Sequence, residues 1–284
     1  MIKVVYFVVS ISLIVFFIPF QSCEKLQQLL PDSLSTEEVV SGLKKALELG
    51  TDSSTKNLSA SNGYYGDILV KIPLPEEAQV VREQIDELSK LTGLSNVFDV
   101  DKEFEDVVKS LNKAAEAAAN DAKPIFSDAI TTMSISDGWA ILNGINPADS
   151  LKADSFDSTA ATQYFKVKTQ SKLVSVYAPY IDTQLDKDLG LGFSANDAWT
   201  ALRTAINTSM NKIEGNIILK PLYTASGIKI NRISSESIGA FATEKALDGL
   251  FLKVGDQEKE IRRDPFKWAI DIIQKVFGSL TEKI

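Results

Sequence analysis

The apolar positions of this chain repeat with a helical period along most of its length. The clearest stripe runs from Phe104 to Ala118, where apolar residues recur every three or four positions and the second half is rich in alanine. This spacing places the apolar side chains on one face of a helix. Weaker stripes of the same kind predict further helices over residues 35–50, 75–93, 124–133, 139–142, 160–177, 194–213, 235–254, 256–263 and 265–277.

Local signals set the predicted ends of several helices. The sequence from Ser35 to Glu38 has the form of a capping box, and Gly50 provides a stop signal. The polar, glycine-containing segment from Thr51 to Gly66 is therefore predicted to be a loop. Pro179 is expected to kink or end the long helix that starts near residue 160.

Two segments lack the helical period. Residues 68–75 are apolar but contain two prolines, so they cannot lie inside a helix and are predicted to form an extended strap. Residues 217–230 are β-branched and contain Pro221 and Gly227, a pattern that fits either an irregular loop or a small hairpin. We therefore predict a mainly α fold, a single multi-helix domain with an extended apolar strap and, in the second interpretation, a small hairpin.

The N-terminus has the pattern of a bacterial lipoprotein signal. Lys3 precedes an apolar run that ends shortly before Ser22 and Cys23, an order typical of a secretory signal peptide. A spanning helix would need about 20 apolar residues, whereas two serines and Pro19 interrupt this run. A cleaved signal with a free or intermolecularly bonded cysteine is the other alternative. We predict a signal peptide over 1–22, a lipidated Cys23 with a tether to 34, and a helical domain over 35–284.

Composition excludes several function classes. The chain contains no histidine and one cysteine, so Ser/His/Asp and Cys/His catalysis and histidine-bearing metal sites are ruled out. Its formal net charge of −8 argues against nucleic-acid partners and against charge-driven binding to anionic membranes, because both need basic patches. No cofactor and no metal site is predicted. Asp182, Asp186 and Asp188 are close together in the sequence, but they lack the regular ligand spacing of a calcium loop.

The chemistry that remains depends on carboxylates and on buried polar residues. Glu116, Asp248, Glu258 and Asp264 are the acids available for acid–base work. Each also has a structural interpretation; for example, Asp264 precedes Pro265 and is expected to cap a helix. The candidate polar cluster is interpreted first as a network that specifies the fold and second as a ligand site. Its members are Asn112, Glu116, Thr162, Tyr164, Thr169, Lys245 and Asp248, with Arg262 as a further candidate that pairs with another helix.

Several strings of residues resemble the domain-of-unknown-function family 4197. They are the strings at 71–75, 112–116, 160–165, 245–251, 261–265 and 276–278, which read KIPLP, NKAAE, AATQYF, KALDGLF, IRRDP and VFG. The resemblance extends in order from about Glu38 to Gly278. It implies a helical, exported and often lipid-anchored bacterial protein, and it implies no reaction.

Two function classes follow from these observations. The first is a non-enzymatic binding or envelope assembly module, attached to the membrane by a lipid on Cys23 and placed on the outer membrane with its domain in the periplasm. It would bind a protein or an apolar small molecule in a groove that is lined by aromatic side chains; the candidates are Tyr64, Tyr65, Phe104, Phe165 and Phe251. The alternative is an exported hydrolase using Asp/Glu chemistry, in which two or more acids must converge in a pocket, whereas in a scaffold they are paired separately.

Overall fold

The computed structural model describes residues 34–93, 97–148 and 155–281. The predicted signal peptide and the lipidation site at Cys23 lie outside these ranges. From Thr36 onward the chain forms one compact helical unit. None of its described residues belongs to a β-strand, which confirms the mainly α prediction.

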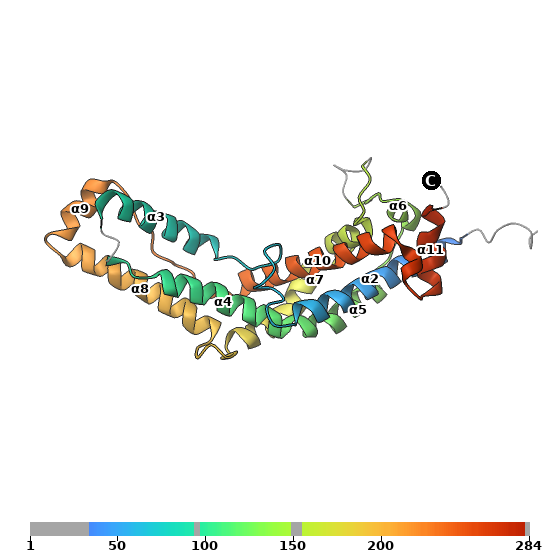
Figure 1. Cartoon of the computed structure of the whole chain (residues 1–284), viewed down its shortest axis with the longest axis horizontal. Helices are drawn as coiled ribbons and strands as arrows, with labels where there is room; N and C mark the ends of the chain where they lie inside the picture. Colours follow the sequence, from blue (N-terminus) through green and yellow to red (C-terminus); the bar gives the residue numbers. More distant parts are fainter. Residues whose placement is uncertain (1–33, 94–96, 149–154, 282–284) are drawn as a thin grey trace, which may run out of the picture. The chain divides into compact units, whose positions relative to one another are not determined.

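The domain consists of helices and the segments that connect them (Figure 1). They are α2 (Thr36–Leu58), α3 (Glu76–Thr92), α4 (Asp101–Ala118), α5 (Ala122–Thr132), α6 (Gly138–Leu142), α7 (Ala160–Leu185), α8 (Ala195–Gly215), α9 (Leu219–Ser226), α10 (Gly239–Arg263) and α11 (Asp271–Thr281), with 3₁₀ turns η2 (Ala119–Asp121) and η3 (Pro265–Lys267). None of the helices among the described residues is both long enough and apolar enough to span a bilayer.

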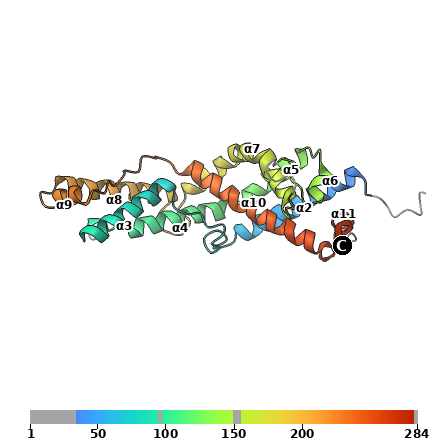
Figure 2. The ribbon, with the colours of Figure 1, turned by 90° about the horizontal axis from the view of Figure 1, so that it is seen from above.

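Two groups of helices share this domain. α10 packs against α2 and α7, and α5 covers the other sides of α2 and α7. α4 extends from this group to α8, while α9 contacts α3 and α8 at the end of the domain away from α11 (Figures 1 and 2). At the centre of the first group the rings of Phe126, Phe165 and Phe251 lie 5.2–5.5 Å apart. Apolar stripes with the helical period therefore form the core, as the sequence predicted.

The prediction that Gly50 ends the first helix is wrong. α2 continues to Leu58 because Gly50 faces α10, where an added Cβ would lie 3.1 Å from Cγ1 of Val254. Beyond it Thr51, Ser54 and Thr55 are buried, and Thr55 Oγ1 donates a 2.9 Å hydrogen bond to the Thr51 carbonyl within the helix. The glycine therefore permits close helix approach and does not provide a stop.

Pro179 was expected to kink or end its helix, and the second alternative is wrong, since α7 continues through Pro179 to Leu185. Proline inside a helix costs about 3 kcal/mol, but Tyr177, Ile181 and Leu185 are all buried on the same helix face. Packing of that face outweighs the local cost.

Three further boundaries differ from the sequence prediction. Residues 219–226 form α9 in place of a hairpin, because Asn216 Oδ1 accepts the N–H groups of Ile218 and Leu219 and starts a helix. α10 is continuous where two helices were predicted, and Gly255 in its middle lies close to Thr159. The last predicted helix divides into η3 and α11.

Candidate functional site

Glu258 on α10 caps the first turn of α7. One of its carboxylate oxygens accepts the N–H of Ala161 at 3.0 Å, and the other accepts the N–H and hydroxyl of Thr162 at 2.8 and 2.7 Å. Glu258 is only 1 % exposed. The first N–H groups of a helix have no partner within it and carry the positive end of its dipole, so a buried carboxylate is stabilised there.

Arg262 completes this arrangement from the next turn of α10. Its Nε and Nη2 donate to Glu258 at 2.9 and 2.7 Å, while Nη1 and Nη2 donate to the carbonyls of Leu142 and Ile141 at 2.7 and 2.9 Å. Those carbonyls end α6, where a cation is favourable. Glu258 and Arg262 thus join the end of α6 to the start of α7, and we call this pair the helix-end clamp.

Glu116 on α4 holds the backbone that follows α2. Its Oε1 accepts the N–H groups of Tyr64 and Tyr65 at 3.3 and 3.1 Å, and Lys113 binds its Oε2 at 2.9 Å. Burial, with smaller contributions from Tyr177 and Glu116, raises the pKa of Tyr64 well above its ordinary value. The Tyr64 hydroxyl therefore stays neutral and donates to the Ala246 carbonyl at 2.7 Å.

Asn112, one turn before Glu116, fixes the apolar strap. Its Oδ1 accepts the N–H of Ile72 and its Nδ2 donates to the Ile72 carbonyl, both at 2.8 Å. In this way a side-chain amide satisfies both backbone groups of a buried residue, as a neighbouring strand would. Of the strap predicted over residues 68–75, residues 71–75 are free of helix and turn, with Ile72 and Leu74 buried. Residues 68–70 instead form a turn, in which the N–H groups of Val70 and Lys71 donate to the Asp67 carbonyl.

Lys245 and Asp248 lie on a more open face of α10. Asp248 accepts from Lys166 of α7 at 2.8 Å, and Lys245 lies 3.7 Å from its other oxygen. The Asp248 side chain is 36 % exposed, so this is a surface ion pair. The neighbouring Gly249 faces the core, where an added Cβ would lie 2.7 Å from the Tyr64 ring. Contact between segments therefore accounts for this glycine.

Tyr164 and Thr169 line a pocket of about 420 Å³ between α5 and α7. Both hydroxyls donate hydrogen bonds within the protein. The Tyr164 hydroxyl donates to the Ser134 carbonyl at 3.1 Å, and the Thr169 hydroxyl donates to the Phe165 carbonyl at 2.7 Å. Lys168, whose ammonium lies 5.4 Å from the Tyr164 ring centre, is also part of the lining. The pocket contains no carboxylate among its lining residues.

The eight candidate residues therefore divide into local groups. Thr162 and Arg262 meet through Glu258, Asn112 and Glu116 hold the strap and the turn before it, Lys245 and Asp248 form a surface pair, and Tyr164 and Thr169 line a pocket. Sequence reasoning named Glu258 only as a possible acid and missed its capping role. The carboxylate four residues before Arg262 was the available signal, since that spacing puts both on one helix face.

The remaining acids have structural roles or separate positions. Asp264 makes no side-chain cap to η3, so the capping prediction is wrong; Pro265 offers no N–H, and the Asp264 backbone instead ends α10 through the Glu260 carbonyl at 3.0 Å. Asp188 Oδ1 accepts the N–H groups of Gly190, Leu191 and Gly192, and these bonds lower its pKa. The described part of the chain contains no group of three or more acids or cysteines that could hold a metal ion.

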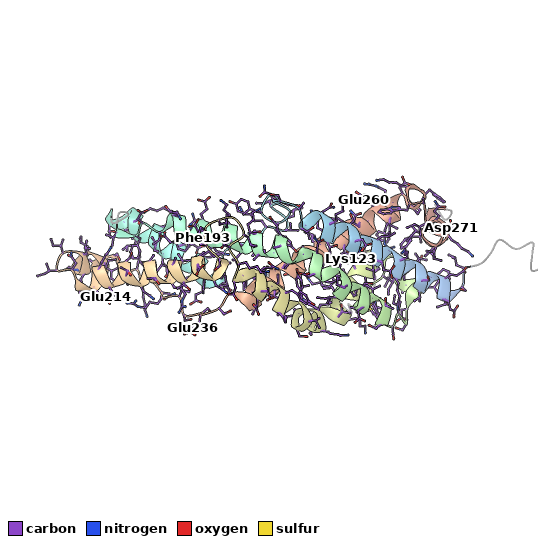
Figure 3. All side chains as sticks on the ribbon, turned by 90° about the horizontal axis from the view of Figure 1, so that it is seen from below. Lys123, Phe193, Glu214, Glu236, Glu260 and Asp271 are labelled. Atoms are coloured by element: carbon purple, nitrogen blue, oxygen red, sulfur yellow. The ribbon has the colours of Figure 1, made fainter. Side chains whose placement is uncertain are left out.

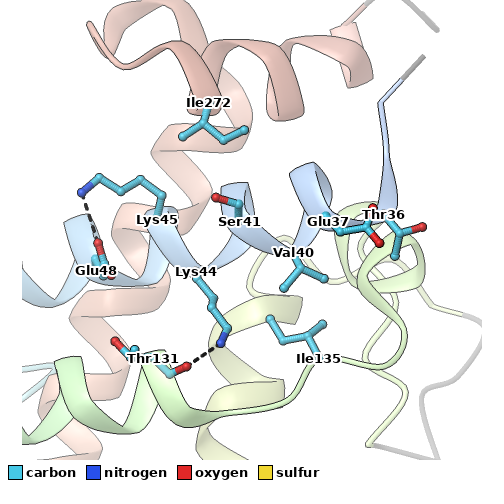
Figure 4. Close-up of a pocket in the computed structure, with 10 residues that line it drawn as sticks. All are labelled: Thr36, Glu37, Val40, Ser41, Lys44, Lys45, Glu48, Thr131, Ile135 and Ile272. Atoms are coloured by element: carbon cyan, nitrogen blue, oxygen red, sulfur yellow. Dashed lines mark hydrogen bonds and ion pairs between the residues drawn. The ribbon is translucent and has the colours of Figure 1, made fainter. Parts of the chain in front are cut away.

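A further pocket of about 690 Å³ lies on the outer face of α2 (Figure 4). Val40, Ser41 and Lys44 line it from α2, with Ile135 and Ile272 opposite. Its acids, Glu37 and Glu48, are eleven positions apart on one helix, or about 16 Å along the axis. Paired carboxylates of glycoside hydrolases lie within about 10 Å of each other, so these two do not form such a pair.

The aromatic residues expected to line a groove lie mostly in the core. Tyr64, Phe104, Phe165 and Phe251 are each at most 3 % exposed, and Tyr65 is half-buried. Their packing therefore leaves no open aromatic groove for a partner at these positions.

Comparison with known proteins gives a family and nothing finer. The comparison with curated proteins found no match, and the comparison with solved structures found none either. The model of a family described as proteins of unknown function, DUF4197, matches residues 33–278, which contain the strap, the helix-end clamp and the Glu116 site. By this match over most of its length, the chain belongs to the DUF4197 family.

Proposed function

We propose that this protein is a non-enzymatic lipoprotein of the bacterial cell envelope. In this proposal a lipid on Cys23 holds it at the outer membrane, and the helical domain is displayed in the periplasm for a binding or assembly partner. One observation carries the proposal. The two buried acids, Glu116 and Glu258, accept hydrogen bonds from backbone N–H groups and from a lysine or arginine side chain.

The geometry favours this function over an Asp/Glu hydrolase. A catalytic acid–base pair needs two carboxylates that face the same cavity, with environments that separate their pKa values. Glu116 and Glu258 each accept hydrogen bonds from at least three donors, and neither lines one of the pockets described above. Asp248 is bound to Lys166 on the surface. Such carboxylates serve as structural acceptors.

The anchor is tested by substituting Cys23 in a chain that keeps its signal. Wild-type protein should fractionate with membranes and incorporate a fatty-acid label, because each buried methylene contributes about 0.8 kcal/mol to membrane binding. Cys23→Ser should lose both the label and the membrane association. Ser22→Ala is the matched control, since it keeps a small residue before the cysteine. A Cys23→Ser protein that stays in the membrane with residues 1–22 attached would instead establish a spanning helix.

The binding role is tested by cross-linking in intact cells, followed by capture from detergent-solubilised membranes. We expect a partner that is enriched with wild-type protein and retained with Glu116→Gln. If purified protein instead hydrolysed an envelope substrate, and Glu116→Gln or Glu258→Gln abolished that activity in a folded chain, the hydrolase would replace the present proposal.

A further inference from the structure

We propose that the connection from α8 through α9 is a second membrane contact, which inserts apolar side chains into a bilayer surface containing anionic lipids. We call residues 211–229 the α8–α9 tip. Its function would be to dock the domain on a lipid surface independently of Cys23. The proposal therefore goes beyond the lipid anchor and does not rest on it.

The tip exposes bulky apolar side chains in one short segment. Ile217 is 89 % exposed, Ile218 69 % and Leu222 45 %. The segment is held in shape, because Asn216 Oδ1 accepts the N–H groups of Ile218 and Leu219 at 2.8 and 3.0 Å. Single exposed apolar residues are ordinary, but a group of them on an ordered turn indicates an interaction surface.

α9 itself lacks the burial that normally supports a helix. It has eight residues, and none of them is buried, although α9 contacts α3 and α8. A helix of this length is marginal in water, and in proteins its stability comes mainly from burying one face. The protein covers the apolar side of α9 only in part, since Leu219 and Tyr223 are half-buried and Leu222 is exposed, and the interface of a bilayer would cover the remainder.

The charged residues of the α8–α9 tip favour an anionic lipid surface as its partner. Lys212, Lys220 and Lys229 form no ion pair with any residue that the structure describes. Glu214, the one acid of the tip, is labelled in Figure 3 and lies 3.7 Å from Arg232. The tip is thus positive in a chain whose net charge is −8. The net charge of the whole chain does not report the charge of one local patch, because charges act over only about 8–10 Å at ordinary ionic strength.

The neighbouring helix α3 does not reverse this sign at its end. Its exposed acids closest to Gly93 are Asp86 and Glu87, more than one turn before it, and Lys90 follows them. Each lysine near an anionic leaflet should raise affinity about five-fold. A protein partner would not require this combination of uncovered isoleucines and unpaired lysines, which is typical of helices that lie in the membrane interface.

The test uses the mature chain, residues 23–284, carrying Cys23→Ser so that no lipid is present. Co-sedimentation compares vesicles of phosphatidylcholine alone with vesicles that also contain phosphatidylglycerol. We expect binding to the anionic vesicles, weakened by salt and reduced at least about ten-fold by Ile217→Asp with Ile218→Asp, since two inserted side chains are lost. Ile68→Asp is the matched control, because Ile68 is 85 % exposed on a different turn, and it should bind as the parent does.

A second variant reports insertion directly. The fluorescence of Ile218→Trp should shift to the blue and be quenched by brominated lipids when anionic vesicles are added. Equal binding to both vesicle types, or full binding by the double aspartate variant, would overturn the proposal. A dimer in sedimentation velocity that the aspartates abolish would overturn it in favour of a second copy of the chain.

Discussion

Removing Arg262 should destabilise the domain more than removing any surface cation. Arg262→Ala removes the cation that pairs with the buried Glu258, and it leaves the carbonyls of Ile141 and Leu142 without their Arg262 donors. Breaking a buried ion pair from one side costs about 3–5 kcal/mol. The α7 amides that still bind Glu258 keep the loss within this range.

The assay is thermal and urea unfolding followed by circular dichroism at neutral pH. For a domain of this size 1 kcal/mol corresponds to about 2–4 °C, so Arg262→Ala should lower Tm by about 6–20 °C. Arg262→Lys should recover only part of the loss, since an ammonium cannot reproduce the planar fork that contacts Glu258 and both carbonyls. Glu258→Ala should show non-additive coupling with Arg262→Ala in a double-mutant cycle.

Lys259→Ala provides the matched control on the same helix. Lys259 pairs with Asp256 at 3.0 Å, but their side chains are 48 % and 40 % exposed, and exposed pairs of this kind contribute about 0–1 kcal/mol. If Arg262→Ala and Lys259→Ala lowered stability equally, by less than about 1 kcal/mol, the clamp would not stabilise the domain as the geometry indicates.

Glu116→Ala should cost about 1–3 kcal/mol because it strands buried amides, whereas Asp248→Ala should cost less than about 1 kcal/mol because its ion pair is exposed; unfolding curves that reverse this order would contradict the assignment. Gly249→Ala should lower stability by about 1–3 kcal/mol, since its Cβ would meet the Tyr64 ring, and an unchanged Tm would show that the ring moves aside freely. The hydrogen bond from Lys253 lowers the pKa of Asp67 below its ordinary value, so the resulting stabilisation is fully present above that ordinary pKa and is lost as pH falls through the lowered pKa. Asp67→Asn should flatten the acid limb of a Tm-against-pH curve, and an identical limb would count against this contribution.

The helical class followed from the sequence because apolar spacing depends only on which residues share a helix face. Helix ends were predicted less accurately from the sequence, since local stop signals compete with tertiary packing that cannot be deduced from the sequence alone. Gly50 and Pro179 are both recognised breakers, yet one lies against α10 and the other lies in a helix whose buried face continues to Leu185. In both cases tertiary burial exceeds a local cost of about 1–3 kcal/mol.

The candidate site residues were also predictable from the sequence only in part. Burial of Asn112, Glu116 and Thr162 was predictable from the helix stripes around them. Their partners were not, because those partners are mostly backbone groups, and backbone groups carry no sequence signal. The N–H groups that Glu258 accepts are 96 and 97 positions away in the chain, and no spacing rule reports a contact of that separation.

Because of the helix-end clamp, the stability of the domain depends little on the length of the segment between α6 and α7. Both ends of that segment are fixed by α10, independently of the residues that join them. Closing a longer loop between fixed ends costs only about 0.6 kcal/mol for each doubling of its length. Insertions or deletions between residues 146 and 157 should therefore be nearly neutral for folding, and relatives of this chain are free to vary there without any adjustment in the core.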